Sequence, residues 1–420
     1  MKQPANIQRI LITALVIETI CVTYALYLPL LTGLLSVLYT LTGITIAYGL
    51  LWMKPAPPSK IDPVFSLSSN TNRYRWLLMA IALFIMCRFS MQWMTDDPLD
   101  YHYADMLPII KIMNERFLAG AWSHVYDPIP EIWHGTVPIY LPGMWLPFSL
   151  PEAIHIDIRW LTVALLFIVL GIFLWKMNPF RKNAWLVFMC AFLIYWWLFA
   201  DEIAGLLTFT EEGIIIFYYV LLTLALMKRN IWLIAICASL CALSRYALIG
   251  WLPAMVIYFA YNKEWKNLLR FAVTGIACFL GLVLFPFGWK IVDALIALPK
   301  SYIEFTGRVW RDAPRVFTGS LGWAKFFGPK HIFELHYLLI VLSLTAPLLA
   351  MLLALRLSKK YQLPVQNIPL AVLKLSLVIF FSFIDVPYLY LFYTSSFVSI
   401  IAIACFLLRE NDEKKSIRAI

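Results

Sequence analysis

Long apolar runs dominate the chain, and short clusters of Lys and Arg separate most of them. A run of about 20 apolar residues is long enough to cross a bilayer as a helix. The pattern therefore predicts about twelve crossings, several of them short. We place them at residues 9–29, 31–52, 76–94, 158–175, 184–200, 212–227, 230–243, 246–261, 269–287, 334–355, 369–386 and 388–408.

Composition narrows the class of protein. Hydrophobic residues make up 62% of the 420 residues and charged residues 14%, whereas soluble domains are about 45–50% apolar and about 25% charged. This excludes a soluble or disordered chain, and the uninterrupted apolar runs argue against an outer-membrane barrel. We expect an all-α polytopic membrane protein with about twelve transmembrane helices, one partial helix and one interfacial helix. The seven cysteines lie in apolar stretches without a disulfide or zinc pattern.

The basic clusters predict an orientation, because short cytoplasmic loops are enriched in Lys and Arg. We expect a two-helix segment at 1–53, a cytoplasmic linker at 54–75, a main module at 76–408 and a cytoplasmic tail at 409–420. Two long connections, at about 95–136 and 288–333, then lie on the extracytoplasmic face of a bacterial inner (plasma) membrane. In a soluble protein a net charge of +10 would suggest binding to nucleic acid. Here the Lys and Arg residues lie in short loops between apolar runs, so we expect a lipid bilayer and no nucleic acid as partner.

The apolar stretch at 137–150 needs a separate interpretation. A full crossing there would move the basic loop at 176–182 to the outside, and the stretch contains Pro138, Pro142 and Pro147, with Pro151 just after it. We expect a broken helix that enters from the outer face, where protein or water surrounds irregular backbone. The alternative is a short complete span with one basic loop that breaks the charge rule.

The first long outer connection begins with a cluster of carboxylates: Asp96, Asp97, Asp100 and Asp105 follow a predicted span within ten residues. Thr95, Asp96 or Asp97 is expected to cap a helix with Pro98 in its first turn. Apolar spacing predicts an interfacial helix over Met106–Leu118. Capping requires one carboxylate, so the other acids favour chemistry, although a merely solvated loop is the alternative.

Other charged residues could share a site with this cluster. Two acidic pairs end or begin neighbouring spans, Asp201 with Glu202 and Glu211 with Glu212. Each pair is either functional or part of an acidic rim. The second long connection carries a basic cluster suited to phosphate, and Arg245 is either a snorkelling anchor or another phosphate contact. The members of the cluster are Arg308, Arg311 and Arg315.

Four segments resemble the GT-C superfamily of membrane glycosyltransferases. Asp97-Pro98-Leu99-Asp100-Tyr101 resembles the acidic motif of their first outer loop, in which an Asp precedes a Tyr by four residues. Pro98 stands where many members have a second acid, so Asp96 or Asp100 must supply it. The segment 137–142 loosely resembles a Tyr-Pro-Pro-like motif, Arg159 a later Arg, and the segment 386–391 the opening of a late span. The resemblance extends from about Arg75 onward.

The resemblance implies inverting transfer of a hexose, of mannosyl type, from a polyprenyl-phosphate sugar donor to a glycan, lipid or protein acceptor. Asp97 would be the general base, with Asp100 and Asp96 as substitutes, and Arg308, Arg311, Arg315 and Arg245 would bind the donor phosphate. No nucleotide is required in such a site, and whether a divalent metal takes part stays open. The expected substrate cavity is formed by Tyr101, His102, Asp105, Asp201, Glu202 and Tyr388.

Two other functions compete with this one. A multi-span transporter or lipid-linked sugar flippase would place charges along a pathway. Here the charges gather in the outer loops, Glu18 and Lys374 are the main charges deep within predicted spans, and no inverted repeat is visible. A membrane scaffold without chemistry of its own is the second competitor. Substitution of Asp97 distinguishes an enzyme from a scaffold, and vesicle uptake tests transport.

Overall fold

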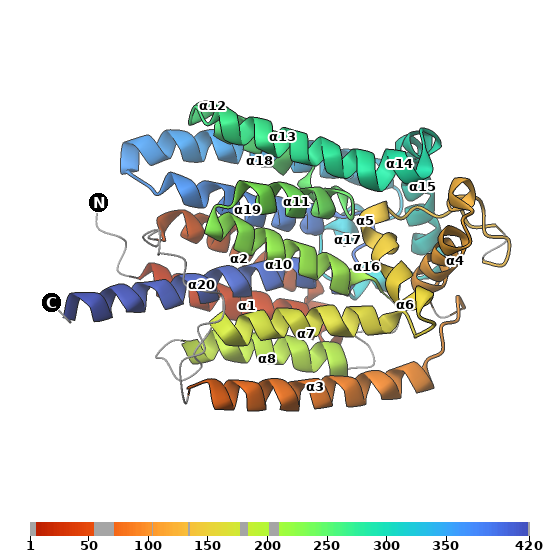
Figure 1. The fold of residues 1–420 in the computed structure, drawn as a ribbon, viewed down its shortest axis with the longest axis horizontal. Helices are drawn as coiled ribbons and strands as arrows, with labels where there is room; N and C mark the ends of the chain where they lie inside the picture. Colours follow the sequence, from red (N-terminus) through yellow and green to blue (C-terminus); the bar gives the residue numbers. More distant parts are fainter. Residues whose placement is uncertain are drawn as a thin grey trace.

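The computed structural model describes residues 6–53, 71–102, 104–132, 135–176, 184–200 and 210–418. Regular structure within these ranges is helical, apart from one isolated bridge between Ile129 and Thr136. Long helices lie side by side along the long axis of the molecule (Figure 1). They are α1 (Ile7–Tyr24), α2 (Thr32–Trp52), α3 (Thr71–Asp96), α7 (Arg159–Lys176), α8 (Ala184–Ala200), α10 (Glu212–Lys228), α11 (Ile231–Ala242), α12 (Trp251–Tyr261), α13 (Trp265–Phe279), α18 (Ile332–Tyr361), α19 (Ile368–Phe383) and α20 (Phe392–Arg418).

Mostly shorter helices gather at one end of this bundle, on the right in Figure 1, which we call the short-helix end. They are α4 (Met106–Leu118), α5 (Pro142–Trp145), α6 (Ser149–Ala153), α14 (Phe285–Phe287), α15 (Lys290–Asp312), α16 (Arg315–Thr318) and α17 (Ala324–Phe327). Single turns join the helices. They are η1 (Ala25–Tyr27), η2 (Pro29–Leu31), η3 (Trp122–His124), η4 (Leu146–Phe148), η5 (Tyr246–Leu248), the π-helical η6 (Leu280–Leu284), η7 (Val365–Asn367) and η8 (Leu389–Leu391).

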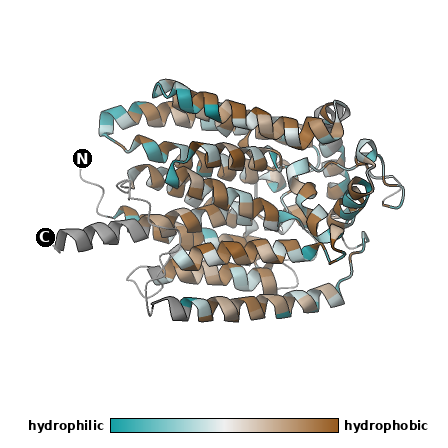
Figure 2. Cartoon of the chain, viewed as in Figure 1, coloured by the Kyte–Doolittle hydropathy of each residue, from teal (hydrophilic) through white to brown (hydrophobic). Residues whose placement is uncertain are grey.

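Apolar residues cover the long helices, as the hydropathy colouring in Figure 2 shows. Among the described residues, seven helical segments are long and apolar enough to cross a membrane: 7–27, 29–52, 75–96, 265–287, 332–361, 365–383 and 389–406. Large apolar side chains on α3 and α14 face outward, with Phe84 72% and Phe285 83% exposed. Such exposure is costly in water, so the apolar helices indicate an integral membrane protein. The other predicted crossings form helices of 11 to 18 residues.

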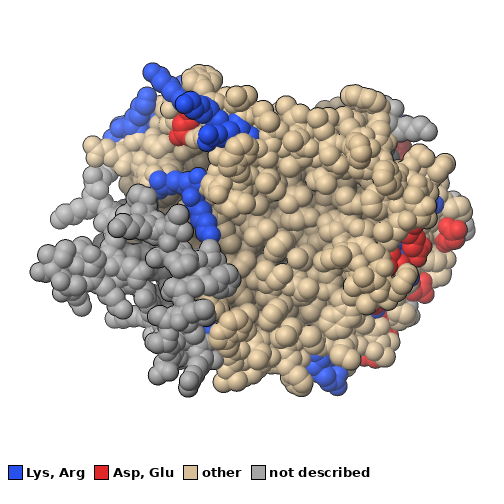
Figure 3. Space-filling view, in the orientation of Figure 1, with Lys and Arg blue, Asp and Glu red and all other residues tan. Residues whose placement is uncertain are grey.

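Charge divides the two ends of the bundle. The two long connections, with α4 and α15–α17, lie at the short-helix end, as the charge pattern predicted. The start of α1, the end of α20 and the last turn of α18, which carries Lys359 and Lys360, lie at the other end, which we call the basic end. On the face drawn in Figure 3, Lys and Arg gather mainly at the basic end and Asp and Glu at the short-helix end.

The Pro-rich stretch at 137–150 forms a broken helix, as predicted, since α5, η4 and α6 follow one another as separate short pieces. It docks closely on the end of α11. The N–H of Gly143 donates to the carbonyl of Leu243 at 2.9 Å, and a Cβ on Gly143 would come within 2.8 Å of that carbonyl. Glycine is therefore required for the approach of the two backbones.

The first two helices are part of the bundle and do not lie apart from it. α1 packs on α8 and α20, and α2 packs on α19. A Cβ on Gly43 of α2 would lie 2.3 Å from Val378 Cγ2 of α19, so a small residue allows the two helices to approach closely. Of the linker predicted at 54–75, residues 54–70 lie outside the described residues, and residues 71–75 belong to the start of α3.

Candidate functional site

The acidic segment ends one helix and does not cap the next. Thr95 donates to the carbonyl of Met91 at 2.8 Å, and the N–H of Asp97 donates to that of Trp93 at 2.9 Å. Both groups therefore continue the pattern of α3. The predicted capping role of Thr95, Asp96 or Asp97 is wrong, because α4 begins ten residues later. Its N-cap residue is Asp105, without a side-chain capping bond. The predicted helix over Met106–Leu118 is confirmed as α4.

Arg159, at the start of α7, fixes the beginning of the acidic segment. Its guanidinium donates to the carbonyls of Asp97 at 2.7 Å and Met94 at 3.2 Å, and it pairs with Asp157 at 2.6 Å. The side chain is 2% exposed. Carbonyls at a helix C-terminus lack intrahelical partners, so Arg159 satisfies two of them and holds Asp97, which is half-buried, in place.

The middle of the acidic segment lies at the surface. Asp96 is exposed, and Asp100 pairs with His102 at 2.6 Å, with 40% and 63% of the two side chains exposed. The backbone N–H of His102, and then its ring, lower the pKa of the Asp100 carboxyl. Tyr101 stacks on His102, with ring centroids 4.0 Å apart. These predicted site residues form a local turn with one another.

A buried ionic centre lies deeper at the same end, and we call it the Glu211–Arg245 centre. Arg245, just before η5, donates to Glu211 Oε1 at 3.0 Å and to Glu212 Oε2 at 2.6 Å at the start of α10. The side chains are 12%, 1% and 0% exposed. Thr394 of α20 donates to Glu212. Removing these charges from water costs several kcal/mol for each ion, and the pairing offsets this cost.

Two atoms of this centre have no hydrogen-bond partner among the described residues. Glu211 Oε2 and Arg245 Nε are buried and make no hydrogen bond, although other atoms of the same side chains are paired. The terminal nitrogen of Arg245 that bonds to Glu211 and Glu212 is not free to bind a phosphate. The two carboxylates also more than offset the positive charge of the guanidinium. The snorkelling alternative also fails to describe Arg245, because its guanidinium is held by buried acids.

Several tyrosines and one acid of the acidic segment lie within electrostatic range of the centre. Asp105 lies close enough to act electrostatically on Glu211, Tyr140 and Tyr388. Tyr302 of α15 is within the electrostatic reach of Arg245 and Glu211. Tyr390 of η8 lies within electrostatic range of Glu211 and Arg245. Its hydroxyl donates to Met106 Sδ at 3.5 Å. Segments from across the chain thus converge here, including two predicted cavity residues, Asp105 and Tyr388.

A His–Asp pair lies beside this group and was not found from the sequence. His336 Nδ1 of α18 lies 2.6 Å from Oδ2 of Asp385, which follows α19. The side chains are 10% and 0% exposed. Within the described ranges, His336 Nε2 and Asp385 Oδ1 have no hydrogen-bond partner. The sequence signal that could have pointed to this pair is the position of Asp385, directly before the segment 386–391 that resembles a GT-C region.

The basic cluster lies on the surface. Arg308, Arg311 and Arg315 are exposed, and Arg308 stacks over Phe305 at 5.9 Å. Nearby, Lys325 of α17 donates to the carbonyl of Ser320, and partial burial lowers the pKa of the amine to about 8. The cluster shares the short-helix end with the acidic segment, and α15 brings Tyr302 to the Glu211–Arg245 centre.

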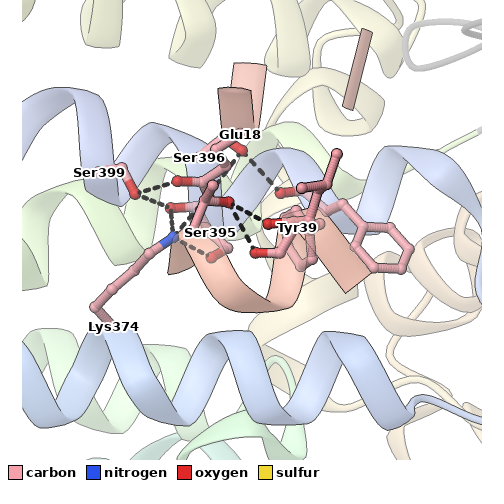
Figure 4. Close-up of polar contacts among 9 residues, drawn as sticks. Glu18, Tyr39, Lys374, Ser395, Ser396 and Ser399 are labelled. Carbon is pink, nitrogen blue, oxygen red and sulfur yellow. Dashed lines mark hydrogen bonds and ion pairs between the residues drawn. The ribbon is translucent and has the colours of Figure 1, made fainter. Parts of the chain in front are cut away.

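Another buried ion pair lies within the bundle itself, and we call it the Glu18–Lys374 network (Figure 4). Lys374 of α19 donates to Glu18 Oε1 of α1 at 2.6 Å, and to the hydroxyl and carbonyl of Ser395 at 2.7 and 3.1 Å. Ser396 and Ser399 donate to Glu18 Oε1 and Oε2 at 3.1 and 2.9 Å. Both charged side chains are fully buried. The charges noted deep in the spans therefore neutralise each other.

Some predictions remain open. Asp201 and Glu202 lie outside the described residues. Across the described ranges, no group of three or more His, Cys, Asp or Glu side chains is placed to hold a metal ion. No protein-family model matches the chain, and no curated protein or solved structure is significantly similar to it.

Proposed function

We propose that the protein is a multi-pass glycosyltransferase with about twelve crossings and its active site at the short-helix end. In this proposal that end faces the extracytoplasmic side of a bacterial inner membrane. The donor is a polyprenyl-phosphate sugar, the acceptor is a hydroxyl of a glycan, lipid or protein, and the transfer inverts the anomeric carbon. The resemblance of four segments to GT-C enzymes motivates the reaction class.

One observation carries the proposal: the acidic segment and the Glu211–Arg245 centre meet at one end of an apolar bundle. Asp105 acts electrostatically on Glu211 and Tyr388, which follow it by more than 100 and more than 280 residues. Burying an ionised group in a membrane protein costs free energy, and such groups usually serve a function. A lipid-linked donor would arrive through the membrane and a hydroxyl acceptor through water, and both media adjoin this end.

The chemistry assigned to this end is a single displacement. A carboxylate of the acidic segment, Asp97 in the first instance, takes the proton of the acceptor hydroxyl. The acceptor oxygen forms a bond to the anomeric carbon while the bond from that carbon to the phosphate oxygen breaks. The electron pair leaves with the polyprenyl phosphate, whose growing charge the exposed arginines of α15 and α16 stabilise.

Substitution of Asp97 tests the proposal. Asp97→Asn keeps the shape of the side chain, so it should fold normally and lose about 10²–10⁴ in transfer rate. The assay follows labelled sugar from a panel of polyprenyl-phosphate hexoses to hydroxyl acceptors in proteoliposomes. Asp100→Asn and Asp105→Asn are run alongside it. Loss only in one of these assigns the base to that residue. Normal transfer in all three variants would rule out the acidic segment as the base.

The runner-up function is a transporter or lipid-linked sugar flippase. The buried charges of Glu18 and Lys374 within long apolar helices are the observation in its favour. Proteoliposomes loaded with the same donor separate the two functions. Movement of intact donor across the bilayer without bond cleavage would support transport and contradict transfer.

A further inference from the structure

In the Glu211–Arg245 centre, two buried atoms lack a hydrogen-bond partner among the described residues. Glu211 Oε1 is bonded to Arg245, but Glu211 Oε2 is buried without a donor. Arg245 bonds through a terminal nitrogen, but its Nε–H is buried without an acceptor. A buried polar group without a partner costs about 1–3 kcal/mol, and more if it is charged. Such groups in a native protein indicate a missing partner, which is either ordered water or a ligand.

The two unpaired atoms differ in what they require. Glu211 Oε2 needs a donor and Arg245 Nε needs an acceptor. A hydroxyl group supplies both, because its hydrogen donates and its oxygen accepts. A molecule with several hydroxyls can serve the two atoms at once, either through one hydroxyl or through neighbouring ones.

The net negative charge of the centre restricts the class of ligand that it can bind. Two carboxylates face one guanidinium in the centre, and Asp105 adds another carboxylate within electrostatic reach. The excess charge is negative in a poorly solvated place, where like charges repel strongly. A phosphate or a carboxylate would therefore be disfavoured, and a neutral polyhydroxylated molecule would not.

Aromatic side chains complete the surroundings. Tyr388 and Tyr390 stack on each other with centroids 5.4 Å apart. Tyr388 lies within electrostatic range of Asp105, and Tyr390 within that of Glu211 and Glu212. Tyr140 and Tyr302 add two more rings from distant segments. Ligand sites typically combine aromatic walls with a few convergent polar groups. The C–H faces of a sugar ring suit such walls, and its hydroxyls suit Glu211 and Arg245.

We propose that the Glu211–Arg245 centre binds the hydroxyl groups of a neutral sugar, with Glu211 Oε2 accepting and Arg245 Nε donating. This rests on the proposed function in that the sugar is the one on the donor or acceptor of the transfer. Arg245 then orients the sugar and does not contact the donor phosphate, a role that stays with the exposed arginines.

The test compares Glu211→Gln with Glu131→Gln, which removes an exposed carboxylate from the loop after α4. In the transfer assay, Glu211→Gln should raise KM for neutral polyprenyl-phosphate hexoses about tenfold to a hundredfold, as expected for loss of a hydrogen bond to a charged group. It should also improve the use of a donor that carries a uronic acid, because one repelling charge is gone. Glu131→Gln should change neither value.

Binding of free methyl hexosides by saturation-transfer NMR separates this inference from the proposed function. Binding by the wild type that Glu211→Gln weakens supports the centre, even if no transfer is found. An unchanged KM and unchanged glycoside binding in Glu211→Gln would show that water alone fills the centre and would overturn the proposal. Arg245→Lys, which keeps the charge but lacks Nε, provides a second variant and should weaken glycoside binding in the same way.

Discussion

The Glu18–Lys374 network and the Glu211–Arg245 centre are both buried ion pairs, but they differ in how completely their atoms are paired. In the network, both carboxylate oxygens of Glu18 have partners in α19 or α20, and the ammonium of Lys374 has partners in α1 and α20. In the centre, Glu211 Oε2 and Arg245 Nε have none in the described part of the chain. A complete set of partners leaves nothing for a ligand to add, whereas an incomplete one does.

Both sites draw on the same turn of α20. Thr394 donates to Glu212 in the centre, while the next residue, Ser395, accepts from Lys374 in the network. Successive residues on a helix point in directions about 100° apart, so one turn can serve two neighbours. The comparison assigns the network to holding α1, α19 and α20 together, and the centre to a ligand.

The largest expected loss of folding stability comes from breaking the ion pair between Glu18 and Lys374. Lys374→Met leaves the Glu18 carboxylate buried without its counter-ion, which should cost about 3–5 kcal/mol of folding stability. Tryptophan fluorescence during thermal unfolding in detergent measures it. The double variant Glu18→Leu/Lys374→Met should recover most of the loss, because no buried charge remains. A double variant as unstable as the single one would contradict this account.

A smaller effect should distinguish the two carboxylates. Ser399 is the donor recorded for Glu18 Oε2, so Ser399→Ala should cost about 1–3 kcal/mol. Glu211→Gln, by contrast, should change the stability of the ligand-free protein by about 1 kcal/mol or less. The amide oxygen can still accept from Arg245, Glu212 still neutralises the guanidinium, and Oε2 makes no bond to lose. The same unfolding assay measures both. Equal losses would mean that the centre is as complete as the network.

The smallest effect is stabilisation by ligand. A neutral methyl hexoside at ten times its Kd should stabilise the wild type by about 1.4 kcal/mol, because it binds only the folded state. Ser399→Ala should gain as much, since it lies outside the centre, and Glu211→Gln should gain less. A thermal shift of equal size in Glu211→Gln would place the sugar elsewhere.

Apolar periodicity predicted most of the long helices. The apolar runs predicted the helices of the bundle, and the spacing after Asp105 predicted α4 at its bounds of Met106–Leu118. The 23-residue helix α15 was not predicted, because it lies in the second long connection outside the apolar runs. Four prolines predicted the interruption that separates α5, η4 and α6. Local spacing misassigned the capping role of Thr95, Asp96 or Asp97, because Thr95 and Asp97 hydrogen-bond backward along α3. A polar side chain or amide after an apolar run suits either the end of one helix or the start of another.

The sequence by itself determined an apolar helical bundle, its broken Pro-rich segment and the concentration of acids and a basic cluster at one end. Only the tertiary structure decided which charges meet: Glu18 with Lys374 across 356 residues, His336 with Asp385 across 49, and Arg245 with Glu211 across 34. The physical reason is that helix formation depends on neighbours within a few residues. The pairing of a buried charge depends on helix packing, which no local pattern encodes.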